Sequence, residues 1–290
     1  MKILILTSGG DAPGMNMVIG TLFKTFKGKL YGCRAGYKGL INNDIVSMKE
    51  YKPLEVIKEA GSVIKCSRCD AFKDEEHFKK AVENAKRFDA VIVLGGNGSL
   101  KGAQELVKVG VNTIFIPATI DNDIEGSDYS LGYHTAVKAG CEAYRNIMPS
   151  FDAHERVAVI EVMGNKSGNL AKSVAKICNP TFVFTSLDEI DYNEITKAVL
   201  LNKEKGESSS IIIKDHLIEI DEMVENISNR VGNVEVRGIK VGYIQRGYKP
   251  TNRELQMAKS FAKGCIKAIK TNKSAKIFFK NGKVVLEKFE

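Results

Sequence analysis

The sequence predicts an α/β fold made of two lobes, each with a parallel sheet between layers of helices. Short apolar runs, typical of buried parallel strands, alternate along the chain with longer amphipathic segments, as in a doubly wound sheet. Loops rich in Gly or Asp directly follow three of the predicted strands, where ligands of open α/β sheets bind. The chain has 290 residues, a length that two βαβ lobes sharing a cleft explain better than a single sheet does.

Each predicted strand is a short apolar run. We place the strands at residues 3–6, 30–34, 90–94, 113–116, 156–162, 181–185, 209–213 and 234–243. Each predicted helix mixes apolar and polar positions at helical spacing. We place the helices at residues 53–59, 74–86, 100–108, 132–146, 169–177, 192–204, 221–230 and 253–270, with one more after the loop at 7–16. Asp74 is a predicted N-cap, and residues 277–286 are interpreted as a short apolar tail.

The composition is that of a globular protein, with 43% hydrophobic and 27% charged residues. The net charge of +8 suits anionic ligands such as nucleotides and phosphosugars, and no basic stripe interleaved with aromatic residues points to nucleic acid. No apolar run reaches membrane-spanning length, and residues 1–6 are too short for the apolar region of a signal peptide. The six cysteines contain no zinc-binding arrangement. We therefore expect a cytoplasmic protein without nucleic-acid or membrane partners.

An acidic segment follows the predicted strand at 113–116. Residues 117–124 of this segment contain Asp121 and Asp123, two positions apart. One carboxylate there can accept a proton, and the second can contact a substrate hydroxyl or a metal shell. The alternative is an Asp-rich surface turn, because Asn and Asp are common in turns.

Two glycine loops, at residues 9–16 and 95–99, each join a predicted strand to a predicted helix. Glycines let backbone amides approach a phosphate closely, and a helix N-terminus adds a favourable dipole. Neither loop is a Walker motif or the G-x-G-x-x-G fingerprint of dinucleotide-binding dehydrogenases, so each alone is also compatible with an ordinary strand-to-helix turn. Together with the acidic segment, the two loops are predicted to line one crevice.

Four motifs, in order and at similar spacing, resemble those of the phosphofructokinase family. They occupy residues 9–16, 119–123, 161–164 and 245–247, and the similarity extends over nearly the whole chain, with a short C-terminal part. The NAD kinases share a similar glycine loop but lack the Thr-Ile-Asp-Asn-Asp segment. The resemblance implies the phosphofructokinase fold, with two Rossmann-like three-layer lobes and the active site in the cleft between them. It also implies a nucleotide-binding lobe at residues 1–133 with 244–290, and a sugar-phosphate-binding lobe at 134–243.

By resemblance, the activity is that of an ATP-dependent 6-phosphofructokinase, which phosphorylates the 1-hydroxyl of fructose 6-phosphate in glycolysis with Mg²⁺ and ATP. Asp121 is the implied general base, and the implied catalytic set is Asp121, Arg68 and Thr119. The implied nucleotide contacts are Gly9, Arg68, Cys69, Gly96, Asn97, Gly98 and Ser99. The implied sugar-phosphate contacts are Thr119, Asp121, Asp123, Arg156, Met163, Gly164, Asn165, Asp215, Arg237, Tyr243 and Arg246. Because family residues like Arg156 and Arg237 reach across a subunit interface, the resemblance implies a homo-oligomer, with a tetramer as the expected form.

Two small residues favour ATP over pyrophosphate as the phosphoryl donor. Pyrophosphate-using family members carry an Asp where Gly98 stands and a Lys where Ala118 stands. The small side chains here leave room for the α-phosphate of a nucleotide.

Several positions depart from the family pattern. Asn97 stands where family members carry an Asp that helps hold Mg²⁺. The substitutions near the sugar site are Asn165, Asp215, Tyr243 and Tyr248. These changes leave two alternatives open, a weakly active or regulatory phosphofructokinase-like subunit, and a kinase for a different phosphosugar or nucleoside. In the family's effector site, arginines and lysines bind ADP or phosphoenolpyruvate. This chain has Gly20, Glu50 and Met148 at such positions, so we expect little response to those effectors.

Overall fold

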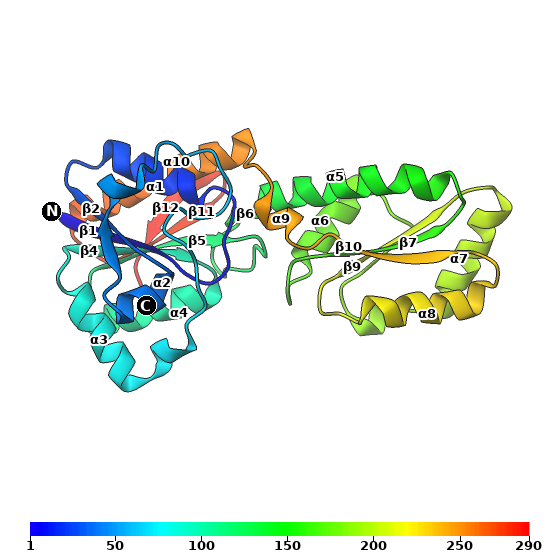
Figure 1. Cartoon of the computed structure of the whole chain (residues 1–290), viewed down its shortest axis with the longest axis horizontal. Coiled ribbons are helices and arrows are strands. Elements are labelled where there is room, and N and C mark those ends of the chain that lie inside the picture. The colour runs from blue at the N-terminus through cyan, green and yellow to red at the C-terminus, as the bar shows by residue number, and fades with distance from the viewer. Residues whose placement is uncertain (290) are drawn as a thin grey trace. The chain divides into compact units, whose positions relative to one another are not determined.

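The computed structural model describes residues 1–289 and divides the chain into two compact units (Figure 1). Unit 1 comprises Met1–Thr135 and Arg246–Glu290, and unit 2 comprises Ala136–Gln245. The chain enters unit 2 within helix α5 (Tyr133–Asp152) and leaves it within the short helix α9 (Ile244–Gly247). Unit 1 is therefore discontinuous in sequence, whereas unit 2 is a single segment.

Unit 1 is built on an eight-stranded sheet in the described part of the chain. The strands are β1 (Lys2–Thr7), β2 (Lys29–Cys33), β3 (Ile45–Ser47), β4 (Ala90–Gly95), β5 (Thr113–Thr119), β6 (Leu131–Gly132), β11 (Ala275–Lys280) and β12 (Lys283–Glu287). Their order is β12-β11-β5-β4-β1-β2-β3, and β6 pairs with β5 beside this path. The inner strands pair in parallel, whereas β3 and β12 at the two edges pair antiparallel to their neighbours.

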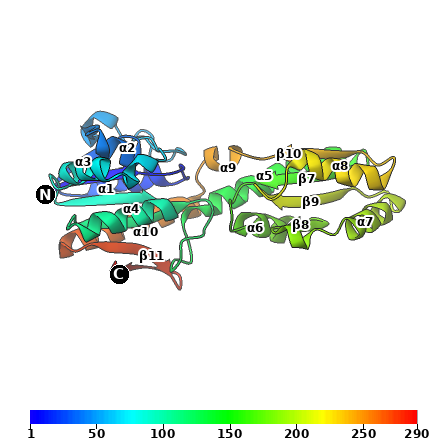
Figure 2. The same cartoon turned by 90° about the horizontal axis from the view of Figure 1, so that it is seen from below.

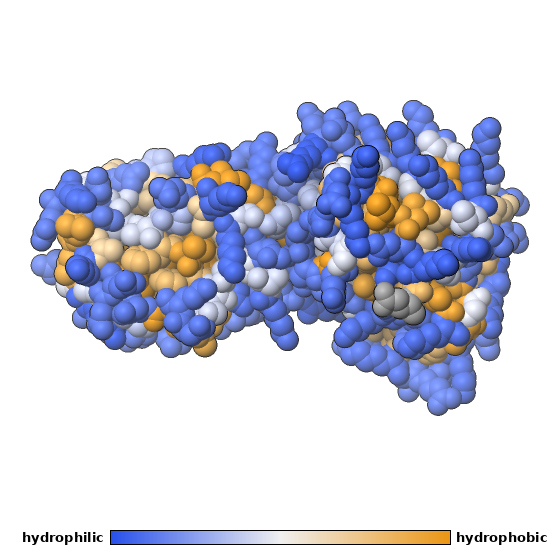
Figure 3. Space-filling model, turned by 180° about the vertical axis from the view of Figure 1, so that it is seen from behind, coloured by the Kyte–Doolittle hydropathy of each residue, from blue (hydrophilic) through white to orange (hydrophobic). Residues whose placement is uncertain are grey.

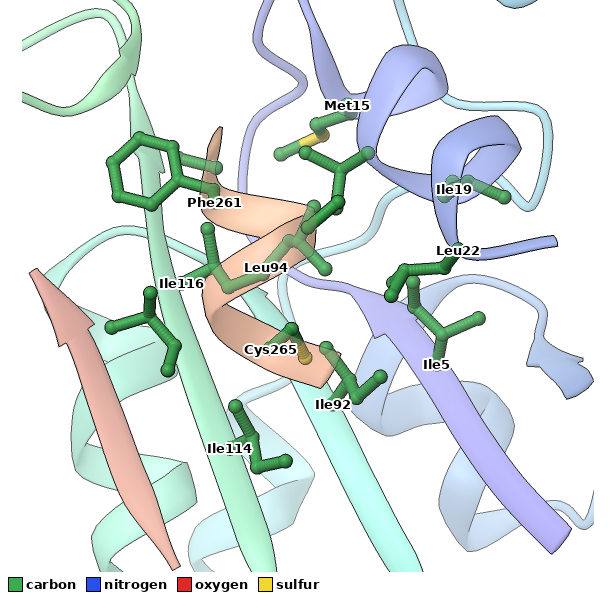
Figure 4. Packing of buried hydrophobic residues seen from close by; sticks show 14 of the residues in the cluster. Ile5, Met15, Ile19, Leu22, Ile92, Leu94, Ile114, Ile116, Phe261 and Cys265 are labelled. Atoms are coloured by element: carbon green, nitrogen blue, oxygen red, sulfur yellow. The ribbon is translucent and has the colours of Figure 1, made fainter. Parts of the chain in front are cut away.

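Alternation of side chains along the strands of unit 1 creates two cores. Helices α1 (Met15–Thr25) and α10 (Asn252–Thr271) cover one face, and α2 (Gly36–Ile41), α3 (Glu75–Ala85) and α4 (Asn97–Lys108) cover the other. Ile3 and Ile5 of β1 belong to the first core, whereas Leu4 and Leu6 belong to the second. Figure 4 shows the first core, where Phe261 and Cys265 of α10 lie among the isoleucines of the sheet.

Unit 2 contains a four-stranded parallel sheet in the order β10-β7-β9-β8 (Figure 2). Its strands are β7 (Val157–Val162), β8 (Phe182–Phe184), β9 (Ser209–Lys214) and β10 (Val236–Lys240). Helices α7 (Tyr192–Glu204) and α8 (Ile220–Val231) pack Ile195, Met223 and Ile227 against Val159 and Ile211 of the sheet. Helix α6 (Asn169–Cys178) lies against β8 and β9, and its Val174 lies close to Gly140 of α5.

Most of the predicted elements are confirmed, and the predicted doubly wound α/β class is correct. Asp74 caps α3 as predicted, because its side chain accepts a hydrogen bond from the backbone N–H of His77. Strand β5 continues to Thr119, three residues beyond its predicted end, and α4 begins at Asn97 rather than at residue 100.

Two predictions about local structure are wrong. The segment predicted as a helix at 53–59 is a series of turns and bends, which follows the 3-10 helix η1 (Met48–Tyr51). Lys52 takes a left-handed conformation with φ 44°, and the backbone bonds from Glu55 to Lys52 and from Glu59 to Val56 span three residues, as turns do. The predicted apolar tail at 277–286 is the β11–β12 hairpin, and its tip has positive φ at Asn281 and Gly282.

Among residues 1–289, the structure contains no helix with the length and apolar character needed to span a membrane. Figure 3 shows one face of the surface, on which hydrophobic groups form small patches separated by hydrophilic side chains.

Candidate functional site

The loops after β1 and β4 lie side by side at the point where the strand order of unit 1 reverses. From β1 the chain continues to β2 on one side, whereas β4 pairs with β1 on the other side. Ligands of open α/β sheets bind at such a switch point, beyond the carboxyl ends of the strands. The N–H of Ser8 donates to the carbonyl of Leu94 at 2.9 Å, and the N–H of Gly9 donates to the carbonyl of Ser67 at 3.0 Å. These bonds fix the first glycine loop against its neighbours.

A cavity of about 580 Å³ opens beside these loops. Both glycine loops line it through Gly9, Gly10, Gly96, Gly98 and Ser99. The end of β5 lines it through Ala118 and Thr119, and the acidic segment lines it through Asp121. The volume lies within the range of small-molecule sites, ~300–1,000 Å³. The predicted crevice of two glycine loops and the acidic segment is therefore present within unit 1.

Cations, aromatic residues and the acids Asp70 and Glu105 also line this cavity. The cations are Arg68, Lys73, Lys101 and Arg246, and the rings are those of Tyr37 and Phe72. The two rings stack with centroids 4.1 Å apart, and the buried hydroxyl of Tyr37 donates to the carbonyl of Ser99 at 2.8 Å. Cationic and apolar surfaces side by side suit a ligand with both anionic groups and a flat ring.

The N-terminus of α4 is open to an anion. Its N-cap is Gly96, which offers no side chain to the N–H groups of the first turn, and a Cβ at Gly98 would meet no atom within 4 Å. Unsatisfied amides and the helix dipole make such an end favourable for phosphate. Asn97, also in this turn, donates from its Nδ2 to the carbonyl of Asp123 at 3.2 Å and does not line the cavity.

The acidic segment is a closed, hydrogen-bonded turn rather than a loose surface loop. The N–H of Asp121 donates to Thr119 Oγ1 at 3.2 Å, and Asn122 takes a left-handed conformation with φ 49°. The Asn122 side-chain oxygen accepts from the N–H of Ser130 at 2.7 Å, and Ser130 Oγ donates to the carbonyl of Thr119 at 2.7 Å. Asp121 lines the cavity, whereas Asp123 is half-buried outside it.

Arg246 brings the segment after unit 2 to the same cavity. Its Nη1 donates to the carbonyl of Asp11, in the first glycine loop, at 2.9 Å. A guanidinium in this position can attract an anion bound by the loop. The family resemblance assigns Arg246 to the sugar phosphate, and that role stays a prediction.

In unit 2, several predicted sugar-phosphate residues gather at the carboxyl ends of β7 and β9. The N–H of Asn165 donates to the Asp215 carboxylate at 2.6 Å, and the N–H of Met163 donates to Gln245 Oε1 at 2.8 Å. Gln245 is wholly buried, and its Nε2 donates to the carbonyl of Ala136. Gln245 begins the motif at residues 245–247, but nothing in the sequence pattern indicates that it positions Met163.

Arg156 and Arg237 lie at the other end of this sheet, near the amino ends of β7 and β10. Both bind Glu235, through Arg156 Nε at 2.5 Å and Arg237 Nη2 at 2.6 Å. Desolvation acts to raise the pKa of Glu235, but the hydrogen bonds and charges of the two arginines outweigh it and lower the pKa. Within unit 2 the structure therefore brings these arginines together with each other, but not with Asp215. Tyr243 is exposed, with 81% of its surface accessible.

The described residues contain no group of three or more His, Cys, Asp or Glu side chains that could hold a metal ion. Mg²⁺ in phosphoryl-transfer sites needs only one or two protein oxygens, because phosphates and water supply the rest. The Asp121 carboxylate at the cavity fits that limited requirement, whereas Asn97 lies in the first turn of α4 without lining the cavity.

Comparisons with known proteins agree with this geometry. A family model described as "Phosphofructokinase" matches residues 2–269. The chain is 33% identical to an ATP-dependent 6-phosphofructokinase of Clostridium botulinum and 35% identical to one of Clostridium novyi, in each case over 98% of this chain and 91% of the relative.

Solved structures share the fold. The phosphofructokinase of Pichia pastoris in the T-state superposes with a TM-score of 0.89 at 24% identity, over 99% of this chain and 34% of that chain. A pyrophosphate-dependent phosphofructokinase from Marinobacter aquaeolei gives a TM-score of 0.81 at 15% identity, over 99% of this chain and 81% of that chain. This chain thus spans about a third of the Pichia chain. The family model and the two clostridial relatives together show that the chain belongs to the phosphofructokinase family.

Proposed function

We propose that this phosphotransferase moves the γ-phosphoryl group of ATP to the 1-hydroxyl of fructose 6-phosphate, giving ADP and fructose 1,6-bisphosphate in cytoplasmic glycolysis. The observation that carries the proposal is the lining of one cavity by Asp121 and by both glycine loops. The cations and stacked rings of the same cavity support a nucleotide as the donor.

In the proposed step, the Asp121 carboxylate accepts the proton of the 1-hydroxyl while the hydroxyl oxygen bonds to the γ-phosphorus. The bond from that phosphorus to the bridging oxygen breaks, and its electron pair leaves with ADP. Arg68 and Arg246 offset the charge on the phosphates, since phosphoryl transfer depends mainly on positioning and charge neutralisation. Mg²⁺ bound to ATP supplies further positive charge there. We assign contacts with the sugar to Thr119 and Asp123 of unit 1, at the end of β5 and in the acidic segment.

ATP is favoured over pyrophosphate because the cavity is open where pyrophosphate-using members carry larger side chains. A Cβ at Gly98 would meet no atom within 4 Å, and Ala118 lines the same cavity with only a methyl group. The names of the clostridial relatives agree with ATP, whereas the Marinobacter protein, whose likeness shows the fold alone, is pyrophosphate-dependent.

A coupled assay with ATP, Mg²⁺ and fructose 6-phosphate tests the proposal. Wild type should turn over, and Asp121→Ser should lower kcat by ~10²–10⁴-fold, the usual contribution of a general base. Glu125→Gln, which removes an exposed acid four residues away, should match wild type. Turnover with pyrophosphate but not ATP would overturn the donor assignment.

A second candidate is a kinase for a different phosphosugar or nucleoside. Asp215 is tied to the backbone of its own unit by the bond from Asn165, and this altered pair lies among the predicted acceptor contacts. A panel of phosphosugars and nucleosides separates the two, because a different acceptor should give a higher kcat/KM than fructose 6-phosphate. Absence of turnover with every acceptor would instead favour the regulatory-subunit alternative.

We also propose that the protein is a homo-oligomer, with a tetramer as the expected form. The Arg237 side chain is 66% exposed in the single chain, although it is paired with Glu235. If Arg156 and Arg237 serve a neighbouring subunit, sedimentation should show an oligomer, and Arg237→Ala should raise KM for the sugar phosphate. A monomer with full activity would contradict this.

A further inference from the structure

Glu254 is a wholly buried carboxylate in unit 1 whose four hydrogen bonds all come from neutral donors. It lies in the first turn of α10, whose N-cap Thr251 accepts from the Glu254 N–H at 3.1 Å. Its Oε1 accepts from the hydroxyl of Tyr129 and from the N–H of Gly132, both at 2.8 Å. Its Oε2 accepts from the N–H and the hydroxyl of Thr135, at 3.0 and 2.9 Å.

Burial of this carboxylate is unfavourable by itself. Removing a charge from water is costly unless hydrogen bonds or opposite charges replace its hydration. Burial raises the pKa of Glu254, and the bonds from Gly132, Tyr129 and Thr135 counteract only part of that effect. Among the described residues no salt bridge involves Glu254, so the helix N-terminus and the four donors are what stabilise it. A side chain with this cost and this many partners holds its neighbours in defined positions.

Those neighbours are the far end of the acidic turn. Ser130 lies between Tyr129 and Gly132, and it bonds to Asn122 and to Thr119. Strand β6 pairs with the end of β5, with Leu131 opposite Ala118 and Gly132 opposite Thr119. The backbone that Glu254 fixes is therefore bonded on both sides of Asp121.

We propose that Glu254 is a positioning residue for Asp121, which it orients through residues 129–132 and Asn122 without touching substrate. The proposal rests on the proposed role of Asp121 as the base. An apolar residue at position 254 could fill the volume, but it would leave four buried donors without an acceptor. Gln keeps the shape, but its NH₂ group takes the place of one of the two acceptor oxygens. The N–H bonds of that group would then face two hydrogen-bond donors.

The test compares Glu254→Gln with Cys265→Ala, a variant of a buried residue on the same helix that lies in the apolar core. Glu254→Gln should lower kcat by ~10–100-fold, because a displacement near 1 Å costs about that much in positioning. KM for ATP should change by less than about threefold, since the glycine loops keep their own bonds. Cys265→Ala should retain wild-type kcat, even where it lowers Tm by as much as Glu254→Gln does.

A double variant separates positioning from general damage. In an Asp121→Ser background, Glu254→Gln should lower kcat no further, because residues acting as a unit are non-additive. An unchanged kcat in the single variant, or additive losses in the double variant, overturns the proposal.

Hydrogen exchange makes the inference testable even if the proposed function fails. If wild type has no kinase activity with any acceptor, the function falls, but Glu254→Gln should still speed amide exchange in residues 119–132 more than Cys265→Ala does. Equal exchange of that segment in the two variants would overturn the positioning role by itself.

Discussion

The guanidinium of Arg246 lies so close to Gly10 that a Cβ at residue 10 would come within 2.3 Å of its Nη1. The same nitrogen donates to the carbonyl of Asp11 at 2.9 Å. Two residues far apart in sequence therefore form one wall of the cavity, and only a residue without a side chain fits at position 10 beside this arginine.

Gly10→Ala should displace Arg246 while leaving the fold intact, because the clash involves the far end of a flexible side chain. The displaced Arg246 would no longer bond to a phosphate of ATP. Loss of a charged hydrogen bond typically costs ~1.5–3 kcal/mol, which corresponds to about a 10–100-fold lower kcat/KM for ATP. Gly247→Ala is the matched control, since its Cβ would meet no atom within 4 Å. Steady-state kinetics beside thermal unfolding checks this, and an unchanged kcat/KM in the Gly10→Ala enzyme would refute it.

Asn97→Asp should lower the Mg²⁺ concentration needed for half-maximal activity, because Mg²⁺ prefers a carboxylate to an amide oxygen. The change also removes the bond from Asn97 to the carbonyl of Asp123. Asn97→Ala removes the same bond without adding charge, so it isolates the metal effect. Magnesium titrations that coincide for the Asp and Ala variants would count against a metal role at this position.

Gly98→Asp should weaken ATP binding by placing a negative charge in the cavity. The variant should fold, because the space around Gly98 is open. Two like charges ~4 Å apart repel by about 1–4 kcal/mol between water and a protein surface, so KM for ATP should rise about tenfold or more. Gly98→Asn has nearly the same shape without the charge. If both variants raise KM equally, bulk rather than charge excludes the nucleotide.

Cys33 and Cys66 should react slowly with alkylating reagents at pH ~8, well below the pKa of either thiol. Burial raises the pKa of Cys33 to about 12 and that of Cys66 to about 11. Only the thiolate is nucleophilic, so the labelling rate should rise about tenfold per pH unit below those values. Mass spectrometry of iodoacetamide-treated protein at several pH values measures this. Rapid modification of Cys66 at the lowest pH of the series would show that its thiol is not shielded.

Local patterns in the sequence predict most strands and most helices, because apolar runs and helical spacing report burial directly, whereas they do not predict the edge strand β3 or the short β6. They also predict the cavity of unit 1, because parallel strands place the loops at 9–16, 95–99 and 117–124 at one sheet edge. The β11–β12 hairpin differs from the predicted tail, although Asn281-Gly282 is the dipeptide that two-residue hairpins favour. The helix predicted at 53–59 does not form, and the end of this segment is instead bonded to α1, since Asn16 Nδ2 donates to the carbonyls of Glu59 and Ala60 at 3.2 and 3.1 Å.

Buried polar residues could not be predicted in the same way. Glu254 follows Arg253 in an otherwise polar helix start, and its burial depends on Tyr129 and Thr135, more than a hundred residues earlier. Gln245 likewise owes its environment to Met163 and Ala136. Such partners come together only through the tertiary fold, whereas propensity and periodicity describe neighbours along the chain.

The split of unit 1 across the sequence has a consequence for synthesis on the ribosome. The core between the sheet and α1 needs Phe261 and Cys265 of α10, and β5 pairs with β11 near the end of the chain. The nascent N-terminal half therefore exposes an apolar sheet face until residues 252–280 have been translated. All of unit 2, in contrast, has been translated once the ribosome has passed Gln245. The second unit to begin translation is thus the first that can finish folding.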